Sequence, residues 1–234
     1  MQVLIVHAHP ETQSFATSLA QTAITTLTDN GHDVALSDLY QMSWNPVASA
    51  ADFHDRADSN YMNYALEQRH NWNANTLSDD ITLEVNKLLA ADLVILNFPL
   101  YWFSAPAIMK GWIDRVLISG VVYGGKRIYE RGGLAGKRAL ITCTLGGRQD
   151  MFGAGSIHGS LHDLLKHLIQ GTLGYAGMTV LEPFFGFHVP YISDADRQQM
   201  LADYRARLNG IMDEDGLSMP DLSKFDSTFR PLQD

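Results

Sequence analysis

Short apolar runs alternate along the chain with segments whose apolar side chains repeat at helical spacing. Four runs are strongly apolar and a fifth, "HDVALSDLY", is weaker; together they cover residues 3–6, 32–40, 92–98, 138–144 and 178–183. The helical pattern covers residues 14–30, 79–92, 105–117, 158–175 and 194–212. Apolar strands that alternate with helices are typical of a parallel sheet that is covered on both faces.

This alternation predicts an α/β fold, a flavodoxin-like doubly wound parallel sheet of five strands in the order 2-1-3-4-5, with helices on both faces. A six-stranded dinucleotide-binding fold produces the same pattern, so the two architectures stay open at this point. We expect Ser14 to begin the first helix, Gly31 to end it and Ser78 to cap the second.

Two segments depart from the alternation. Residues 43–77 are polar, aromatic and rich in Asn, and they are too long for an ordinary connection, so we expect an irregular insert there. Residues 218–234 are expected to form an extended C-terminal arm, whose Phe225 and Phe229 suit contact with a partner subunit. The length predicts a single domain over residues 1–217 that contains the insert and precedes the arm.

Charge and cysteine content narrow the class of protein. The formal net charge is −9 and no Lys/Arg run occurs, so nucleic-acid binding is not expected. The single cysteine, Cys143, lies in an apolar run and predicts a buried thiol in a reducing cytoplasm. Since no signal peptide and no apolar run of about 18 residues is present, we expect no membrane insertion.

The loops after the first, third and fourth predicted strands carry the candidate chemistry, because ligands of open parallel sheets bind beyond the carboxyl ends of the strands. The first loop lacks both GxGxxG and GxxxxGK[ST], but His9 and Ser14 lie at a helix N-terminus that favours a phosphate. The second loop, "PLYWFSAP", supplies flat rings. In the third, Gly146 and Gly147 allow close approach of a ligand. A phosphate beside a flat heterocycle indicates a flavin, with a nucleotide as second choice.

At these residues the sequence resembles the NAD(P)H:quinone oxidoreductases, which are FAD-containing quinone reductases with a flavodoxin-like fold. The resemblance covers nearly all of residues 3–230. It is carried, in order, by "HAHPETQSF", "SDLYQMSWNPV", "AADLVILNFPLYWFSAPAIMKGWIDRV", "LGGRQDMFGAGSIHG" and "GMTVLEPFF".

The resemblance implies a bound FAD, rather than the shorter FMN. Its implied cofactor-binding residues are His9, Ser14, Phe15, Leu100, Tyr101, Trp102, Phe103, Thr144, Leu145, Gly146, Gly147, Phe152 and Arg197. The first three would surround the phosphates, residues 100–103 and 144–147 would follow the two edges of the isoalloxazine, and Arg197 would contact the adenosine end. His158 would be the catalytic residue, near flavin N1 and O2. Family members are homodimers, and on that pattern Tyr123 and Met178 would face the substrate.

Three positions depart from the mammalian members of this family. Phe152 replaces a tyrosine whose hydroxyl supports flavin O2, Tyr101 replaces a glutamine, and Ala16 replaces an asparagine. These changes leave the flavin fold intact and bear on substrate range and rate.

The implied activity is a ping-pong hydride transfer from NAD(P)H through flavin N5 to a quinone, with azo or nitro aromatics as further acceptors. No metal site is expected, because no HExxH motif is present. Two alternatives stay open: a regulatory flavoprotein subunit of a potassium efflux system, and an FMN electron carrier.

Overall fold

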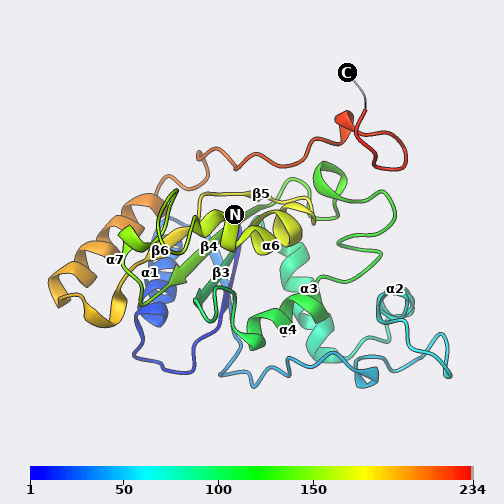
Figure 1. Ribbon diagram of the computed structural model, residues 1–234. Helices are drawn as coiled ribbons and strands as arrows, with labels where there is room; N and C mark the ends of the chain where they lie inside the picture. Colours follow the sequence, from blue (N-terminus) through cyan, green and yellow to red (C-terminus); the bar gives the residue numbers. More distant parts are fainter. Residues whose placement is uncertain (233–234) are drawn as a thin grey trace.

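A computed structural model of the chain describes residues 1–232. All paired strands of its sheet are parallel, in the order β2-β1-β3-β4-β5, and β6 also pairs with β4 (Figure 1). The strands are β1 Gln2–His7, β2 Asp33–Asp38, β3 Leu93–Pro99, β4 Arg138–Thr144, β5 Thr179–Val180 and β6 Phe184–Gly186. The predicted flavodoxin-like fold and strand order are therefore confirmed.

The predicted fifth strand, residues 178–183, is shortened to β5, and a further strand, β6, follows it along the same edge of β4. Leu181 still donates its N–H to the Ala139 carbonyl at 2.8 Å. Pro183 has no N–H, so it cannot continue the ladder. Pairing resumes at β6, which lies beside the last three residues of β4. The edge of the sheet is therefore paired up to the carboxyl end of β4.

The predicted helices are present, although one of them is broken. Their bounds are α1 Phe15–Asp29, α2 Tyr64–Ala74, α3 Asp79–Ala90, α4 Ala107–Val116, α5 Leu161–Leu164, α6 Lys166–Leu168 and α7 Asp194–Leu208. The helix predicted over 158–175 is divided into α5, α6 and a π-helical segment, Ile169–Gly174. Short 3₁₀ turns occur at Ala50–Asp52, Tyr129–Arg131, Gln149–Met151, Val189–Tyr191 and Leu222–Lys224.

The N-terminal caps of α1 and α3 differ from each other. Ser14 Oγ accepts the Thr17 N–H at 3.1 Å, and Gly31 follows α1 with φ +80°, so both ends of α1 are as predicted. Ser78 is the N-cap residue of α3, as predicted, although its side chain forms no capping hydrogen bond to the helix backbone. Its hydroxyl donates to Asp80 Oδ1 at 2.6 Å, and so contacts a carboxylate in the first turn of the helix.

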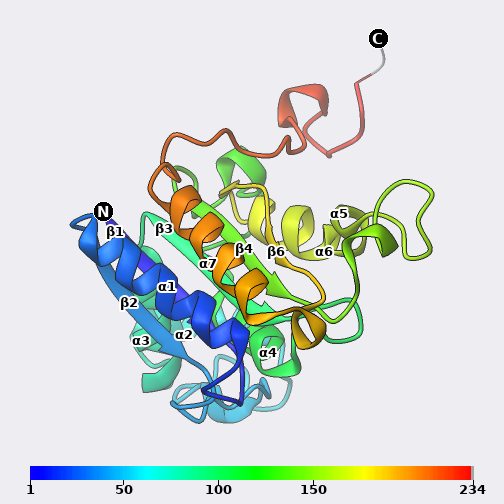
Figure 2. The same ribbon diagram turned by 90° about the vertical axis from the view of Figure 1, so that its left-hand side faces the viewer.

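Two hydrophobic cores lie on opposite faces of the sheet. Leu4 and Val6 of β1 belong to the core that α3, α4 and the 161–174 segment cover. Val3 and Ile5 belong to the other core, which α1 and α7 cover. Figure 2 shows α1 and α7 side by side over that face. The period of two along a strand thus assigns alternate residues to the two cores.

The insert over 43–77 is not irregular throughout, because it contains α2. Asn63 caps this helix by accepting the Leu66 N–H, and Asn75 ends it in the left-handed conformation at φ 57°. Polar contacts, more than an apolar face, hold it: buried Gln68 donates to the Asp114 carbonyl at 3.1 Å and accepts the Ser119 N–H at 3.2 Å. A helix without an apolar stripe gives no helical pattern in the sequence.

Arg115 of α4 joins this insert to the rest of the protein. Its side chain is 3% exposed, pairs with Asp52 at 2.9 Å and with Asp80 at 2.8 Å, and lies over the Trp44 ring. The second oxygen of Asp52 accepts the Tyr64 hydroxyl at 2.6 Å. One buried guanidinium therefore fixes α3, α4 and the first part of the insert relative to one another.

No helix within residues 1–232 is long and apolar enough to cross a membrane.

The variant Arg115→Ala should lose about 3–5 kcal/mol of unfolding free energy, because it leaves Asp52 buried without its counter-charge. Urea unfolding measures the loss. Lys110→Ala removes an exposed ion pair with Asp114 from the same helix, and should lose less than about 1 kcal/mol. Similar small losses in both variants would show that Arg115 does not fix the insert.

Candidate functional site

The loops after β1, β3 and β4 enclose one pocket of about 310 Å³ at the carboxyl edge of the sheet. Its lining residues are His9, Ser14, Phe15, Ala16, Pro99, Leu100, Tyr101, Thr144, Leu145, Gly146, Val189 and Pro190. Eight of the predicted cofactor-binding residues are in this set. The three strands are neighbours in a parallel sheet, so their carboxyl ends necessarily meet here.

The loop over residues 9–14 supplies the polar end of the pocket. His9 Nδ1 accepts the Glu11 N–H at 3.0 Å, which holds the imidazole against its own loop. The Thr17 hydroxyl donates to the Glu11 carbonyl at 3.0 Å, and so joins the loop to the first turn of α1. Unpaired N–H groups and the positive end of the helix dipole make this N-terminus suitable for a phosphate.

The aromatic turn after β3 has a strained backbone. Tyr101 and Ser104 exchange two backbone hydrogen bonds of 3.0 Å, and both residues between them are left-handed, Trp102 at φ 50° and Phe103 at φ 58°. Each such residue costs roughly 1–2 kcal/mol, and strain of this kind is concentrated at functional sites. The Leu100 N–H donates to the Thr144 carbonyl at 2.8 Å, which fixes this turn against the end of β4.

The aromatic residues of this turn have different surroundings. Leu100 and Tyr101 line the pocket. The Trp102 side chain is 97% exposed, and does not belong to the pocket wall of the single chain. Phe103 lies against His158, with the ring centroids 5.3 Å apart.

Of the two glycines after β4, only Gly147 is closely packed against a neighbouring side chain. A Cβ atom on Gly147 would lie 2.8 Å from the Phe152 ring, whereas one on Gly146 would meet open space. His188 fixes the pair by donating its N–H to the Gly147 carbonyl at 2.9 Å. Gly146 therefore presents bare backbone to the pocket, and Phe152 packs behind it.

His158 lies between two aromatic rings just beyond the glycine pair. Its ring centroid is 5.2 Å from that of Phe152 and 5.3 Å from that of Phe103. The imidazole makes no hydrogen bond to any residue in the described part of the chain, so its ring nitrogens are available to a ligand. Arg197 is engaged instead: it pairs with Asp194 at 2.7 Å and donates to the Val189 carbonyl at 2.9 Å. It thereby fastens a loop that lines the pocket.

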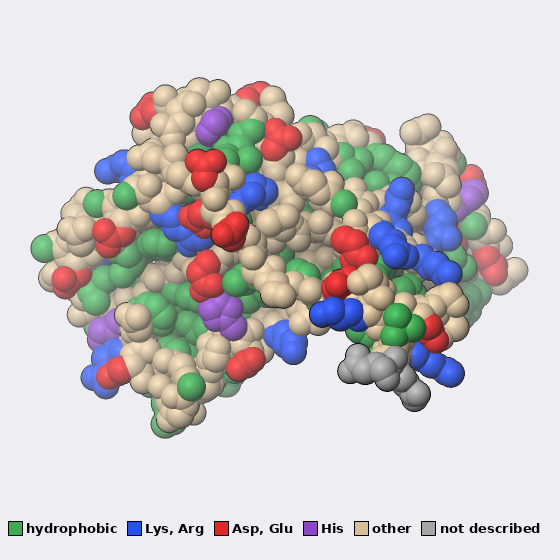
Figure 3. Space-filling model, turned by 90° about the horizontal axis from the view of Figure 1, so that it is seen from above, with side chains coloured by type: hydrophobic (Ala, Val, Ile, Leu, Met, Phe, Trp, Pro, Cys, Tyr) green, Lys and Arg blue, Asp and Glu red, His purple; other side chains and the backbone are tan. Residues whose placement is uncertain are grey.

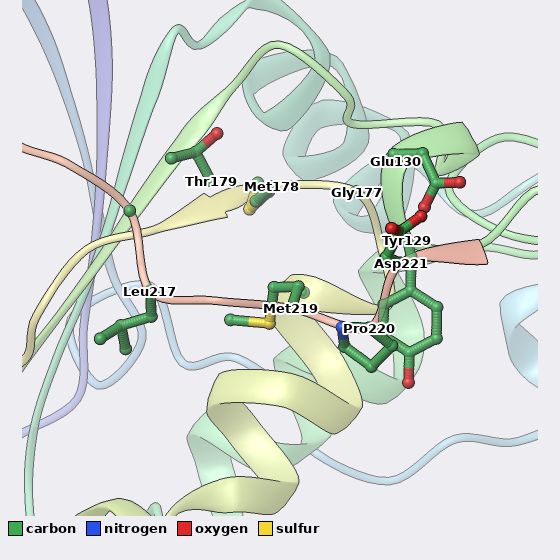
Figure 4. A pocket seen from close by; sticks show the side chains of 11 residues that line it. Tyr129, Glu130, Gly177, Met178, Thr179, Leu217, Met219, Pro220 and Asp221 are labelled. Carbon is green, nitrogen blue, oxygen red and sulfur yellow. The ribbon is translucent and has the colours of Figure 1, made fainter. Parts of the chain in front are cut away.

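Tyr123 and Met178 lie away from this pocket. Met178 is 3% exposed and lines a second cavity of about 440 Å³, between β5 and residues 216–221. Figure 4 shows Met219 and Pro220 of the C-terminal segment close to Met178 and Tyr129. Tyr123 lies on the loop after α4, with its ring 6.1 Å from that of Tyr175. Their role toward a partner subunit's substrate stays a prediction.

Behind the phosphate-favouring loop lies a buried network that the sequence analysis missed. His7 is 2% exposed, and its Nδ1 lies 2.7 Å from the Asn97 Nδ2, which also donates to the Ala16 carbonyl at 2.8 Å. Its Nε2 lies 3.2 Å from the Thr17 hydroxyl oxygen. The only signal in the sequence was a pair of polar residues, His7 and Asn97, inside apolar strands.

These contacts fix the protonation state of His7. A carbonyl can only accept, so the Asn97 amide nitrogen must face Ala16 and its other hydrogen must point to His7 Nδ1. Nδ1 therefore accepts, and the proton is on Nε2, which donates to Thr17. Burial lowers the pKa of His7, against the opposing effect of Asp38. The neutral imidazole thus supports the first turn of α1 from below.

Once this geometry is known, comparison with known proteins identifies the class. The model of the flavodoxin-like fold family matches residues 1–208, and the chain belongs to that family. Within it, the chain belongs to the NAD(P)H:quinone oxidoreductases, so the predicted resemblance and the expectation of an oxidoreductase are confirmed.

Three of its relatives illustrate the similarity. NAD(P)H dehydrogenase [quinone] 1 of Rattus norvegicus is 36% identical over 98% of this chain and 84% of the relative. Ribosyldihydronicotinamide dehydrogenase [quinone] of Mus musculus is 40% identical over 92% of this chain and 93% of the relative. A Klebsiella pneumoniae protein assigned as a quinone reductase has a TM-score of 0.88 and 35% identity, covering 92% of this chain and 86% of that structure.

The stability of the protein should depend on the protonation of His7. Because its pKa is lowered in the folded state, the unfolded chain binds the proton more readily, and the unfolding free energy falls as the pH decreases below about 6.5. His7→Leu should flatten this dependence between pH 7 and pH 5 by up to about 1.4 kcal/mol per pH unit.

Urea unfolding at a series of pH values measures the effect. His54→Leu, which changes an exposed histidine, is the matched control and should keep the wild-type pH dependence. A His7→Leu curve parallel to that of the wild type would contradict the neutral assignment.

Proposed function

We propose that the chain is an FAD-dependent NAD(P)H:quinone oxidoreductase that works by a ping-pong hydride transfer. The observation that carries the proposal is that three loops converge on one pocket. One loop begins a helix whose N-terminus favours a phosphate, one supplies Leu100 and Tyr101, and one supplies the exposed backbone of Gly146. The names of the relatives, which describe dehydrogenation of a reduced nicotinamide with a quinone as acceptor, support the same reaction.

The residues present fit a flavin. Ser14 and the N–H groups of the first turn of α1 suit its phosphates, and the bare backbone of Gly146 lets a flat ring lie close to the end of β4. Arg197 fastens the loop at Val189, which lines the pocket, and would contact the adenosine end of FAD as the resemblance implies. When bound, a flavin supplies the hydride chemistry, and the protein supplies position and charge.

His158 would hold a proton on a ring nitrogen and direct it toward the negative charge that hydride transfer creates at the N1 and O2 side of the cofactor. Phe103 and Phe152 orient the imidazole by ring packing, so the donor is in place before the reaction. Preorganised donors of this kind are typically worth about 3 kcal/mol. Phe152 has no hydroxyl to share this work, so His158 would act alone.

The proposed functional unit is a homodimer in the cytoplasm, formed by the domain over residues 1–217 and the arm from residue 218. Tyr123 and Met178 of one subunit would face the substrate of its partner. Quinones are the proposed acceptors, with azo or nitro aromatics as further ones. The chain spans 93% of the mouse ribosyldihydronicotinamide dehydrogenase, which makes a dihydronicotinamide riboside a second candidate donor.

The deciding experiment is to release and identify the flavin of the purified protein, and then to mix the holoprotein anaerobically with each donor. Bleaching of the flavin, followed by quinone-dependent recovery without accumulated semiquinone, is the expected result. Bound FAD that no donor reduces would favour the regulatory subunit, and a stable semiquinone on FMN would favour the electron carrier.

His158→Ala should lower kcat/KM for quinone reduction by at least about 10-fold while FAD stays bound, because the donor to the developing charge is removed. Stopped-flow measurement of both half-reactions, with flavin content determined in parallel, provides the test. His162→Ala is the matched control, since His162 lies four residues further on and pairs with Glu182 at 2.9 Å. Unchanged half-reactions in His158→Ala would remove this residue from the mechanism.

A further inference from the structure

A pocket of about 360 Å³ on the loop after α4 carries only positive charge. It is lined by Arg69, Asn73, Gly120, Tyr123, Gly124, Gly125 and Arg127. Two arginines and no carboxylate line it, in a protein whose formal net charge is −9. Figure 3 shows several Lys and Arg side chains, with Asp and Glu side chains among them, on the right of the molecule, the side that carries α2 and this loop in Figure 1.

Neither arginine of this pocket is neutralised by a carboxylate in the described part of the chain. Arg69 donates one N–H to the Ser119 hydroxyl at 3.1 Å. Arg127 donates from Nη1 to the carbonyls of Gly120 and Val121, at 3.1 and 2.9 Å. These neutral acceptors hold the guanidinium groups in place and leave their charge, and their other N–H groups, for an anion.

The loop is shaped to let the arginines and a ligand approach its backbone. A Cβ atom on Gly120 would lie 2.8 Å from Arg69 Cγ, and one on Gly124 would lie 3.0 Å from Arg69 Nη2. The Arg127 N–H closes a turn on the Gly124 carbonyl at 3.0 Å. Within residues 1–232, the N–H groups of Gly125 and Lys126 at the tip of that turn form no hydrogen bond to the protein, and so add two donors on the same loop.

We propose that this pocket binds a phosphate group of the nicotinamide nucleotide that reduces the flavin. The inference rests on the proposed function, in which Tyr123, a lining residue of this pocket, faces a partner subunit's substrate. Two guanidinium groups in a fixed arrangement match the oxygens of a phosphate. The quinone carries no phosphate, so the pocket would serve the donor alone.

The test compares three hydride donors that differ in their phosphate groups. NADPH carries a 2′-phosphate and a diphosphate, NADH carries only the diphosphate, and dihydronicotinamide riboside carries neither. In Arg69→Gln and Arg127→Gln, the ratio of kcat/KM for NADPH to that for the riboside should fall about tenfold in each, since each variant removes a charge-assisted contact to phosphate. Arg131→Gln, a change of the same charge on the same loop outside the pocket, should leave the ratio as in the wild type.

The NADH measurements distinguish the two phosphate sources: a loss with NADPH alone assigns the pocket to the 2′-phosphate, and a loss with both nucleotides assigns it to the diphosphate. Unchanged ratios in an enzyme that reduces quinone would overturn this inference and leave the proposed function standing. If the wild type uses none of the donors, the proposed function fails. In that case, calorimetric titration of the holoprotein with NADP⁺ tests the phosphate-binding pocket independently of activity. Weaker NADP⁺ binding in both arginine variants supports the inference, and binding equal to that of the wild type overturns it.

Discussion

Three neighbouring parallel strands end at one edge of the sheet, and the whole candidate site depends on this constraint. The register places His7 of β1 beside Asn97 of β3, so the residues that follow these strands must lie together. The hydrogen bond from Leu100 to Thr144 continues the pairing of β3 and β4 one residue past the strands. Loops that are more than 40 residues apart in the sequence therefore form one pocket without any flexible segment having to fold over it.

The same rigidity permits the strain in the aromatic turn. Two consecutive left-handed residues with bulky side chains would not be stable in an isolated peptide, because each has a costly backbone conformation. Here the turn is closed by two hydrogen bonds between Tyr101 and Ser104, and the sheet holds its first residue. The hydrogen bonds to the sheet offset the conformational strain of Trp102 and Phe103. The Trp102 ring is exposed, and within the single chain no packing contact explains why a tryptophan is present at this position. A residue selected for binding, to a cofactor or to a partner, explains that exposure better than one selected for stability.

Most of the fold, and the location of the pocket, could be predicted from the sequence. Period-two and helical patterns depend on local burial, which apolar residues reveal, so the strands, α1, α3, α4 and α7 were found. Three features escaped for separate reasons. Helix α2 is held by polar contacts and has no apolar stripe; the break between β5 and β6 depends on the missing N–H of one proline; and the His7 network joins residues ten and ninety positions apart, whose proximity no sequence pattern records.

The two candidate anion sites differ in a way that suits their different ligands. At the N-terminus of α1 the attraction comes from fixed backbone dipoles, supported by a neutral buried histidine, and not from any Lys or Arg in the pocket lining. Fixed dipoles lose little on binding and hold a resident cofactor in one geometry. In the pocket beside Tyr123 the attraction comes from two exposed arginines, whose fields are screened by salt within about 8 Å at physiological ionic strength. Exposed charges of this kind accelerate association and still permit dissociation, which is what the proposed ping-pong mechanism requires of a donor that must leave before the acceptor enters.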